Sequence, residues 1–565
     1  MAKKVLIVGG VAGGASVAAR VRRLDEHAEV TMFERGPHVS FSNCALPFFL
    51  SRTVAESDSL VLMCPDQFAK QYNINAKVNS EVVEIKSEEH KVVVKDVLTG
   101  KTYEQEYDKL FLSPGANPIM PRSIKGIDAK HVFPVRNVPD IVKIDNYIKE
   151  NNVKDVAVIG GGFIGVEVME NLHMAGLHVT LVEAANQIMI PFDKDMAQLL
   201  HKEILDNGVD LIVSDGLSEI KEDRVVTSSG REIKAQIVIM AIGVRPEVSL
   251  AVAAGVKLGV TGGIKVDANY RTNIKDVYAV GDAIETYCTQ LQKPTRLTLA
   301  GPAQRQARGA ADDMYGRTVH NKGVIGSSCV KVFEINAANT GLNEKQCQTG
   351  SIQYDYVYII PNDIVGLIPG SNQIHVKLLF EVPTGRIVGC QAIGKGNVDK
   401  RVDVIAALIT KRGTLDDLKE LELCYSPMFS TAKDPLNHAA LVALNILNGE
   451  FKQIKVSEVR GIVENGGYVI DVREPNEWET GHIKTAHNIP MSEFRQRLNE
   501  IPHDRPVYLH CRSAQRSYNV TRALGQLGFD NVYNISGSYL GICCNQYFED
   551  VTLKRDKIVT NYNFI

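Results

Sequence analysis

Two cysteines stand in sequence surroundings that suit sulfur chemistry. Cys44 lies in the segment Ser40–Pro47, where Ala-Leu-Pro follows it and no second cysteine stands nearby. Cys511 follows the predicted strand Val507–His510 and opens a polar segment that leads into a predicted helix. The thiolate is the nucleophilic form, and a helix N-terminus or a nearby cation lowers the pKa of a thiol. We interpret both as candidate nucleophiles and expect the helix after Cys44 to lower its pKa; the alternative for Cys44 is a buried thiol that packs as a small apolar side chain.

Composition restricts the partners and the redox state. A chain of 565 residues predicts about three to four domains. With 63 basic and 66 acidic residues, the net charge of -3 indicates neither a nucleic-acid surface nor a polybasic membrane patch. No run approaches the roughly 18 apolar residues of a spanning helix, so we expect a cytoplasmic protein with no nucleic-acid or membrane partner. The scattered cysteines predict reduced thiols, no metal site and a structural role for Cys543 and Cys544.

A glycine-rich turn lies near the N-terminus, between the predicted strand Val5–Val8 and a predicted helix. Such a turn binds pyrophosphate because backbone N–H groups at the helix start point at the anion. Val11 stands where the pattern has its middle glycine. Glu34 ends the next predicted strand, twenty residues after Gly14, where a carboxylate binds the ribose. The residues predicted to bind this dinucleotide are Gly9, Gly10, Val11, Ala12, Gly13, Gly14, Glu34 and Arg35.

A second and more regular copy of the turn follows the predicted strand Val156–Ile159. The strand after it ends in Glu183, which would bind both ribose hydroxyls and repel a 2′-phosphate. We therefore expect a preference for NADH, with NADPH left open. Two dinucleotide folds in one chain imply two dinucleotides, which favours flavin and nicotinamide chemistry. The residues predicted for this copy are Gly160, Gly162, Phe163, Ile164, Gly165 and Glu183.

Three further predicted strands each end in a turn that suits a nucleotide-binding domain. The first two turns are interpreted as crossings between the two domains. The third delivers Asp282, which is predicted to hold the ribityl chain of FAD; the alternative is an ordinary Gly-Asp turn. The residues assigned to these turns are Ser113, Pro114, Gly115, Gly243, Gly281 and Asp282.

Together these motifs resemble the pyridine nucleotide-disulfide oxidoreductases, flavoproteins with two dinucleotide-binding domains. The segment around Cys44 is similar to that of coenzyme A-disulfide reductases, whose relatives include NADH oxidases and NADH peroxidases. The resemblance covers about residues 1–448 and implies FAD, NADH and coenzyme A as cofactors. It also implies that the third region, residues 323–449, forms the interface of a homodimer.

The resemblance further implies a coenzyme A site. Guanidinium groups suit this ligand because it carries a pyrophosphate and a 3′-phosphate; the alternative for the arginines is a solvated helix face. Tyr425 would lie near Cys44 across the dimer and hydrogen-bond a leaving thiolate, or else pack at the interface. Gly366–Gly370 stands where coenzyme A-disulfide reductases carry Tyr-Tyr-Pro-Gly, so a hydroxyl that serves disulfide turnover is missing. The residues assigned to coenzyme A are Ser16, Arg20, Arg23, Ser40, Asn43 and Lys433, the last contributed in trans.

The C-terminal part, about residues 455–550, resembles a rhodanese domain, which implies that Cys511 carries a persulfide. A loop whose N–H groups face inward at a helix start is an anion cradle. Cysteine-based phosphatases share this cradle, but they need arginine at the position of Ser517. The sequence therefore favours sulfur transfer.

These motifs predict an α/β protein with two Rossmann-like dinucleotide-binding domains, an α+β dimerisation domain and an α/β rhodanese domain. The expected ranges are 1–115 and 246–322 for the FAD domain, 116–245 for the NAD(P)H domain, 323–449 for the dimerisation domain, 450–457 for a linker and 458–565 for the rhodanese-like domain.

The combination predicts an NAD(P)H-dependent flavoprotein that reduces persulfide, polysulfide or coenzyme A disulfide. Because Cys44 has no partner thiol, the storing bond must be a mixed disulfide with coenzyme A, a sulfenic acid or a persulfide. The rhodanese domain favours sulfane sulfur, with Cys511 as its carrier. Two alternatives remain: an NADH oxidase or peroxidase that uses a Cys44 sulfenic acid, and a non-enzymatic sensor of sulfur or redox state.

Overall fold

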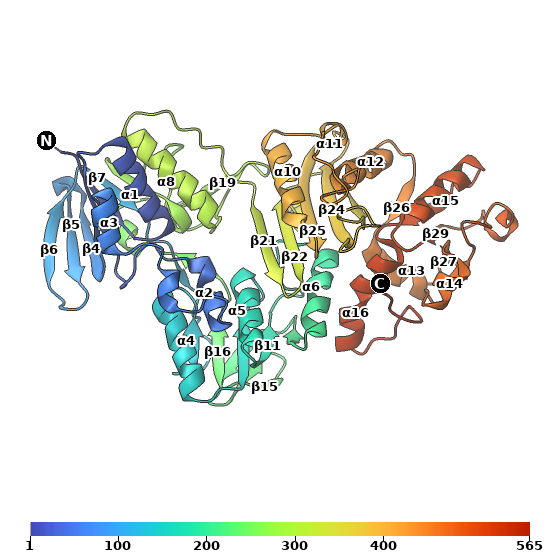
Figure 1. Cartoon of the computed structure of the whole chain (residues 1–565), viewed down its shortest axis with the longest axis horizontal. Coiled ribbons are helices and arrows are strands. Elements are labelled where there is room, and N and C mark those ends of the chain that lie inside the picture. The colour runs from blue at the N-terminus through green and yellow to red at the C-terminus, as the bar shows by residue number, and fades with distance from the viewer. Residues whose placement is uncertain (1, 565) are drawn as a thin grey trace. The chain divides into compact units, whose positions relative to one another are not determined.

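The computed structural model describes residues 2–564, whose elements are labelled in Figure 1. The chain divides into two compact units. The first unit runs to Ala184 and resumes over Ser214–Val324; the second combines Ala185–Val213 with the chain from Ile325 onward. Within the described range, every helix is too short or too polar to cross a lipid bilayer.

The first unit begins with a parallel sheet in the order β18-β7-β1-β2-β3. Its central strand β1 is fully covered, with Val5, Leu6 and Ile7 at most 1% exposed, as expected for a strand buried on both faces. Helix α1 packs on this sheet, and α8 packs on α1. The bounds are β1 (Lys4–Val8), α1 (Ala12–Leu24), β2 (Glu29–Phe33), β3 (Asn75–Lys77), β7 (Lys109–Leu112), β18 (Val277–Ala279) and α8 (Ala300–Met314).

A second parallel sheet of this unit contains β11, β10, β16 and β9 in that order. Helix α2, which follows Cys44, packs on α5, the helix of the second glycine motif, and the Ser51 hydroxyl donates to Asn171 Oδ1 at 2.6 Å. The Cys44 segment thus lies against the second dinucleotide motif. The bounds are α2 (Leu46–Leu50), β9 (Val132–Pro134), α4 (Val138–Glu150), β10 (Asp155–Ile159), α5 (Phe163–Met174), β11 (His178–Val182) and β16 (Ile237–Met240).

Two antiparallel strands connect these sheets at the predicted crossings. Strand β8 (Ala116–Pro118) pairs with β17 (Val244–Pro246). Gly115 and Gly243 precede them with φ of +74° and +107°, a backbone region that glycine adopts without steric cost. The unit also contains two three-stranded antiparallel sheets and a pair of antiparallel strands. The bounds are β4 (Ser80–Lys86), β5 (Lys91–Asp96) and β6 (Thr102–Glu106) for the first sheet, β13 (Leu217–Ile220), β14 (Arg224–Thr227) and β15 (Glu232–Lys234) for the second, and β19 (Thr286–Cys288) and β20 (Lys293–Thr295) for the pair.

The second unit contains a five-stranded antiparallel sheet in the order β21-β22-β25-β24-β23. Helix α10 packs on β22 and β25, and α12 packs on β24 and β23. Nearly every residue of β24 and β25 is buried, so this sheet forms the core of the predicted dimerisation domain. The bounds are β21 (Ser327–Val332), β22 (Ile335–Gly341), α9 (Glu344–Thr349), β23 (Tyr354–Ile359), β24 (Ile374–Glu381), β25 (Ile387–Gly394), α10 (Val398–Thr410) and α12 (Pro435–Leu447).

The C-terminal part forms a parallel sheet in the order β26-β30-β29-β27-β28, as expected for the rhodanese-like domain. Strand β26 (Lys452–Ile454) pairs with β30 inside the segment 450–457 that was expected to be a linker. Part of this segment therefore forms the edge strand of the C-terminal sheet instead of an unstructured linker. The remaining bounds are β27 (Tyr468–Asp471), β28 (His487–Asn488), β29 (Val507–His510), α15 (Gln515–Gln526), β30 (Val532–Ile535) and α16 (Ser538–Thr552).

Helix α6 (Lys194–Asp206) packs in the second unit although its sequence lies in the predicted NAD(P)H domain, 116–245. Lys194 Nζ lies 2.7 Å from the Glu549 carboxylate of α16, and the His201 ring centroid lies 4.5 Å from that of Phe548. Burial lowers the pKa of His201 to about 3, so the imidazole is neutral. Helix α6 therefore belongs to the second compact unit and not to the unit that contains the rest of residues 116–245, because it buries side chains against α16.

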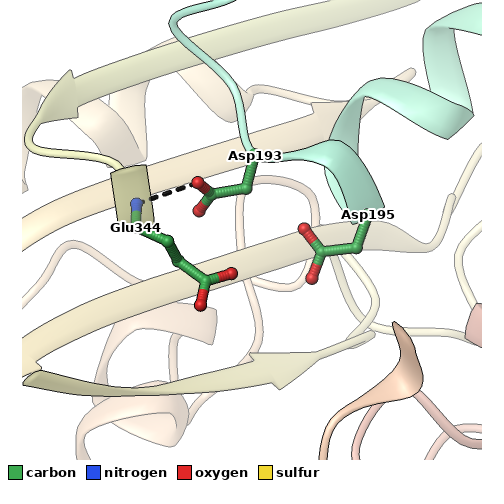
Figure 2. Close-up of side chains that lie close together, drawn as sticks. All are labelled: Asp193, Asp195 and Glu344. Carbon is green, nitrogen blue, oxygen red and sulfur yellow. Dashed lines mark hydrogen bonds between the residues drawn. The ribbon is translucent and has the colours of Figure 1, made fainter. Parts of the chain in front are cut away.

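Three carboxylates converge in the second unit: Asp193, Asp195 and Glu344 (Figure 2). The Lys377 ammonium, 0% exposed, lies 3.2, 2.8 and 2.6 Å from their oxygens. Burial opposes the charge of Lys377, but the carboxylates raise its pKa well above the ordinary value. The lysine therefore supplies the positive charge at the point where these side chains meet.

We expect Lys377→Met to lower the free energy of unfolding by about 3–5 kcal/mol, because two buried carboxylates and the half-buried Glu344 would lose their counter-charge. Urea unfolding followed by circular dichroism measures the effect. Lys419→Met is the matched control, since Lys419 pairs with the exposed Asp416, and it should leave the unfolding curve unchanged. Equal shifts in the two variants would contradict a dominant role for the buried ammonium.

Candidate functional site

The first glycine-rich turn has the geometry of a pyrophosphate site. Gly9 has φ of +96°, and a Cβ added at Gly14 would lie 1.8 Å from the Gly9 carbonyl oxygen. Only glycine permits this contact between turn and helix. Val11, the departure from the pattern, has φ of -110° at the N-cap of α1. Because that angle is open to any residue, the turn keeps its shape with valine there.

Glu34 lies at the end of β2 and is bound to the same turn. Its carboxylate accepts from the Gly10 N–H at 3.0 Å and from the Gly36 N–H at 2.9 Å. These bonds hold the carboxylate where a ribose hydroxyl would bind it. The adjacent Arg35 directs its guanidinium to Asn117 Oδ1, at 3.2 Å.

The second glycine-rich turn repeats this construction. Gly160 has φ of +109°, and a Cβ at Gly165 would lie 1.8 Å from the Gly160 carbonyl oxygen. The Gly161 N–H donates to Glu183 Oε2 at 2.7 Å. A Cβ at Gly162 would meet no atom within 4 Å, so the lack of a side chain leaves open space above the turn, as a pyrophosphate requires.

Asp282 lies beside the first turn, in the short helical turn Gly281–Ala283 after β18. The Gly281 N–H donates to Gln306 Oε1 at 2.8 Å, and burial raises the pKa of Asp282. A Cβ on Gly13 would lie 2.3 Å from Ser113 Oγ, and one on Gly281 would lie 3.4 Å from it. The structure thus brings three predicted motifs together, while Gln306 is a site residue that no motif marked.

Cys44 lies in the 3-10 turn Asn43–Ala45, directly before α2. Its pKa is raised, first by the partial loss of water around the thiol and then by the carboxylates of Glu167 and Asp282. The expected lowering by the following helix is therefore wrong for the protein alone. Helix α2 has only five residues and contains Pro47, which has no N–H to offer to the sulfur.

Glu167 on α5 is the second ionisable group of this site and was missed in the sequence. Burial, followed by the charge of Glu170, raises the pKa of Glu167 to about 7. Near pH 7 the carboxyl is thus partly protonated. Because it acts on the Cys44 thiol, its ionisation at higher pH further disfavours the thiolate.

We expect Glu167→Gln to increase the alkylation rate of Cys44 by roughly two- to fivefold at pH 8, because the nearby negative charge is removed. Iodoacetamide labelling of the reduced full-length protein, with peptide-resolved mass spectrometry, measures the rate. Glu170→Gln is the control, and its expected effect has the opposite sign. Because the charge of Glu170 raises the pKa of Glu167, its removal should leave the Glu167 carboxylate more ionised near pH 7. Labelling of Cys44 at that pH should therefore be slower. Faster labelling in both variants would contradict this assignment.

A cavity of about 440 Å³ in the first unit brings together four residues assigned to coenzyme A. These are Ser16, Arg20, Arg23 and Ser40. Helix α8 adds Gln304 and Arg308, one helical turn apart, and Phe68 and Tyr72 form an apolar wall. The sequence signal that could have marked Gln304 and Arg308 is their i, i+4 spacing on one helix face.

Two of the residues assigned to coenzyme A, Asn43 and Lys433, do not line this cavity, and Arg20, which does, is already paired. Arg20 is held by an ion pair, its Nε donating to Asp312 Oδ1 at 2.8 Å, so its guanidinium is already engaged. Asn43 donates to the Arg136 carbonyl oxygen at 3.4 Å and is not among the lining residues. Lys433 belongs to the second unit and is exposed.

Tyr425 also belongs to the second unit, where it is 51% exposed in an unusually apolar segment. Met428 and Phe429 are 62% and 65% exposed, and Leu367 is 83% exposed. Large apolar side chains gathered on a surface mark a contact with another molecule. This exposure is compatible with the predicted homodimer, in which Tyr425 would act in trans.

Cys511 lies at the end of β29, 1% exposed, before the N-terminus of α15. The Ser517 hydroxyl lies 3.6 Å from its Sγ, at the position where cysteine-based phosphatases need arginine. Ser538 Oγ, which no motif marked, lies 4.0 Å from the same sulfur. Arg516 is held by Glu477 through bonds of 2.6 and 2.7 Å at the loop. The loop therefore offers hydroxyl and cationic groups around one thiol.

None of the ten cysteines, all of which lie within residues 2–564, forms a disulfide. The adjacent Cys543 and Cys544 lie buried in α16, and burial raises their pKa to about 11 and 12. Thiols held protonated in this way are inert, which suits the structural role expected for them.

Comparison with known proteins follows the same division of the chain. A family model described as pyridine nucleotide-disulphide oxidoreductase matches residues 3–307. The chain belongs to this family. The dimerisation domain of the family matches residues 327–435, and a rhodanese-like domain matches residues 455–543. The resemblance predicted from the motifs and the α/β fold class are thereby confirmed.

Three similar proteins illustrate how much of the chain is shared. The coenzyme A disulfide reductase of Staphylococcus epidermidis is 33% identical over 77% of this chain and 98% of its own. The reduced CoADR-RHD protein of Bacillus anthracis is 44% identical, with a TM-score of 0.93 over 97% of this chain and 99% of its own. The NAD-dependent persulfide reductase of A. fulgidus is 32% identical, with a TM-score of 0.90 over 95% and 99%.

Proposed function

We propose that this protein is an FAD-dependent NADH reductase of coenzyme A persulfide and related persulfides, polysulfides or disulfides. The observation that carries the proposal is the placement of Cys44, without a partner thiol, within the electrostatic reach of Glu167 and Asp282 and in the segment that lines the cavity through Ser40. Similarity to a persulfide reductase over 95% of this chain, together with the match to a rhodanese-like domain, supports it. We further infer a cytoplasmic homodimer whose partner subunit contributes Tyr425 and Lys433.

The residues around the two turns fit their cofactors. The packing of Gly9 on Gly14, with Glu34, suits FAD, and the open space at Gly162, with Glu183, suits NADH. The repulsion between Glu183 and a 2′-phosphate favours NADH over NADPH. FAD, when bound, passes the electron pair of NADH to sulfur.

Cys44 performs the sulfur chemistry in this proposal. Its thiolate attacks the coenzyme A sulfur of the persulfide, so that a Cys44–coenzyme A disulfide forms and hydrosulfide leaves. Two electrons then cleave this disulfide, which restores the Cys44 thiolate and releases coenzyme A thiolate. In sum, NADH, one proton and coenzyme A persulfide give NAD⁺, coenzyme A and hydrogen sulfide. Glu167, partly protonated near pH 7, holds a proton in this site.

Cys511 is proposed to carry sulfane sulfur between a donor and coenzyme A. Ser517 and Ser538 surround the sulfur with hydroxyl groups. The Cys511 persulfide passes its outer sulfur to coenzyme A thiolate, which yields the persulfide that Cys44 reduces. This step needs no oxidant or reductant, because a sulfur atom moves from one thiolate to another.

In an anaerobic assay with NADH and coenzyme A persulfide, we expect the wild-type protein to release sulfide. Cys44→Ser should abolish turnover, because the attacking sulfur is lost. Cys511→Ser is the matched control: it should retain reduction of coenzyme A persulfide and lose sulfur transfer from thiosulfate. Full turnover in Cys44→Ser would contradict the assigned nucleophile.

The same assay distinguishes persulfide reduction from the second candidate function, an NADH oxidase or peroxidase. A water-forming NADH oxidase of Lactobacillus brevis is 26% identical, with a TM-score of 0.75, but covers 79% of this chain. An oxidase or peroxidase would act through a Cys44 sulfenic acid. A high rate with peroxide or oxygen, without a thiol or sulfide product, would favour that function over persulfide reduction.

Arg308→Ala should raise the KM for coenzyme A persulfide roughly tenfold, because a guanidinium that lines the cavity would no longer bind a phosphate. Steady-state NADH oxidation measures the KM. A small persulfide without phosphates should show no change. Arg305→Ala on the same helix is the control, since Arg305 does not line the cavity; an equal rise in both variants would exclude this cavity as the coenzyme A site.

A further inference from the structure

The ring of Tyr358, on β23 of the dimerisation domain, lies against the first turn of α16 in the rhodanese-like domain. A Cβ added at Gly537 would lie 2.6 Å from Tyr358 Cε1, and one at Gly541 would lie 3.2 Å from the same atom. Tyr358 is 3% exposed, and its hydroxyl bonds His375 Nδ1 at 2.6 Å. Burial lowers the pKa of His375 to about 4, so the imidazole is neutral. The ring is therefore fixed at its hydroxyl end and presses on bare backbone at its edge.

The same turn of α16 holds the Cys511 loop through three hydrogen bonds. The Cys511 N–H donates to Ser538 Oγ at 3.0 Å. In return, the Tyr539 N–H donates to the Cys511 carbonyl oxygen at 3.1 Å, and the Leu540 N–H donates to the Arg512 carbonyl oxygen at 3.0 Å. A displacement of this turn would therefore move both the reactive cysteine and the hydroxyl next to its sulfur.

The turn itself has an unfavourable backbone conformation. Gly537 has φ of +68° and Ser538 has φ of +49°. A residue with a side chain in this region is strained, and such strain persists where surrounding contacts hold it. Ser538 is 0% exposed. The Cys511 loop holds the turn on one side, and the Tyr358 ring meets it at Gly537 and Gly541.

We propose that Tyr358 is a positioning residue for sulfur transfer at Cys511, acting through the first turn of α16. The dimerisation domain thus supports the turn that positions Cys511, although Tyr358 does not touch the reacting sulfur. This inference rests on the proposed role of Cys511 as a sulfur carrier. The interface between the dimerisation domain and the rhodanese-like domain would then contribute to the reaction as well as to stability.

The reaction that tests this role is sulfur transfer from thiosulfate. The Cys511 thiolate bonds the outer sulfur of thiosulfate, the S–S bond of thiosulfate breaks, and sulfite leaves with the electron pair. Cyanide then takes the outer sulfur from the persulfide as thiocyanate, which restores the thiolate. Because a misplacement of about 1 Å can cost roughly 100-fold in rate, the reaction reports directly on the position of Cys511.

In the full-length protein, Tyr358→Leu should lower kcat for thiocyanate formation by roughly 10- to 100-fold. Tyr358→Phe keeps the ring against Gly537 and Gly541 and should retain kcat within about twofold. Reduction of coenzyme A persulfide at Cys44 should be unchanged in both variants. A loss in the leucine variant that phenylalanine rescues identifies ring packing, apart from the hydrogen bond to His375.

Two further variants keep the test decisive. Gly541→Ala adds a methyl group 3.2 Å from the Tyr358 ring at a helical position where alanine is favoured over glycine, so the protein should fold and kcat should fall several-fold. Tyr356→Leu is the matched control, since Tyr356 is buried on the same strand against Lys377 and Lys455. It should leave kcat unchanged.

The outcomes separate this inference from the proposed function. If the wild-type protein forms no thiocyanate, the role of Cys511 itself is wrong. If the wild-type protein is active and neither Tyr358→Leu nor Gly541→Ala lowers kcat, the positioning role is overturned. An equal loss in Tyr356→Leu and Tyr358→Leu would also overturn it, because a general loosening of the interface would then explain both.

Discussion

Contact between backbone atoms inside each glycine-rich turn is the constraint on which both nucleotide sites depend. Gly14 packs on Gly9, and Gly165 packs on Gly160, so closely that a single Cβ would lie 1.8 Å from a carbonyl oxygen. This contact holds each helix start near the end of its strand and near an acidic side chain. In the proposed function, Cys44 receives its electrons through the nucleotides that these two turns would bind.

The reactivity of Cys44 is a property of two domains together. Asp282 comes from the first parallel sheet, Glu167 comes from a helix of the second, and both raise the pKa of the thiol. Glu167 is itself held near neutrality by its own burial. The protonation state of the thiol therefore depends on how the helix of the second glycine motif packs on the segment that contains Cys44.

The rhodanese-like domain is integrated with the dimerisation domain as one compact unit. Strand β26 occupies the place of the expected linker, and Lys377 on β24 of the dimerisation domain binds carboxylates from α6 and α9. The aromatic ring of Tyr358 then meets the backbone of α16. Polar and steric contacts between the dimerisation domain and the rhodanese-like domain thus hold the part of the chain that contains Cys511.

The sequence by itself determined the fold class, the family and both glycine turns, and it singled out the two candidate cysteines. These features are local: a turn that needs positive φ selects glycine, and the strand after it carries its carboxylate to a set distance along the chain. The coenzyme A assignments of Ser16, Arg23 and Ser40 came from the resemblance, and the structure brings them to one cavity.

Tertiary structure alone decided the rest, because the contacts join residues far apart in the chain. Gln306 binds the Gly281 turn from another helix, and Asp312 engages Arg20 across 292 positions. For the protein alone, the pKa of Cys44 is raised where a helix start suggested a lowering, first because the thiol loses water and then because packing places the carboxylates of Glu167 and Asp282 near it. Charge and burial at a site depend on which segments meet, and no local pattern records that.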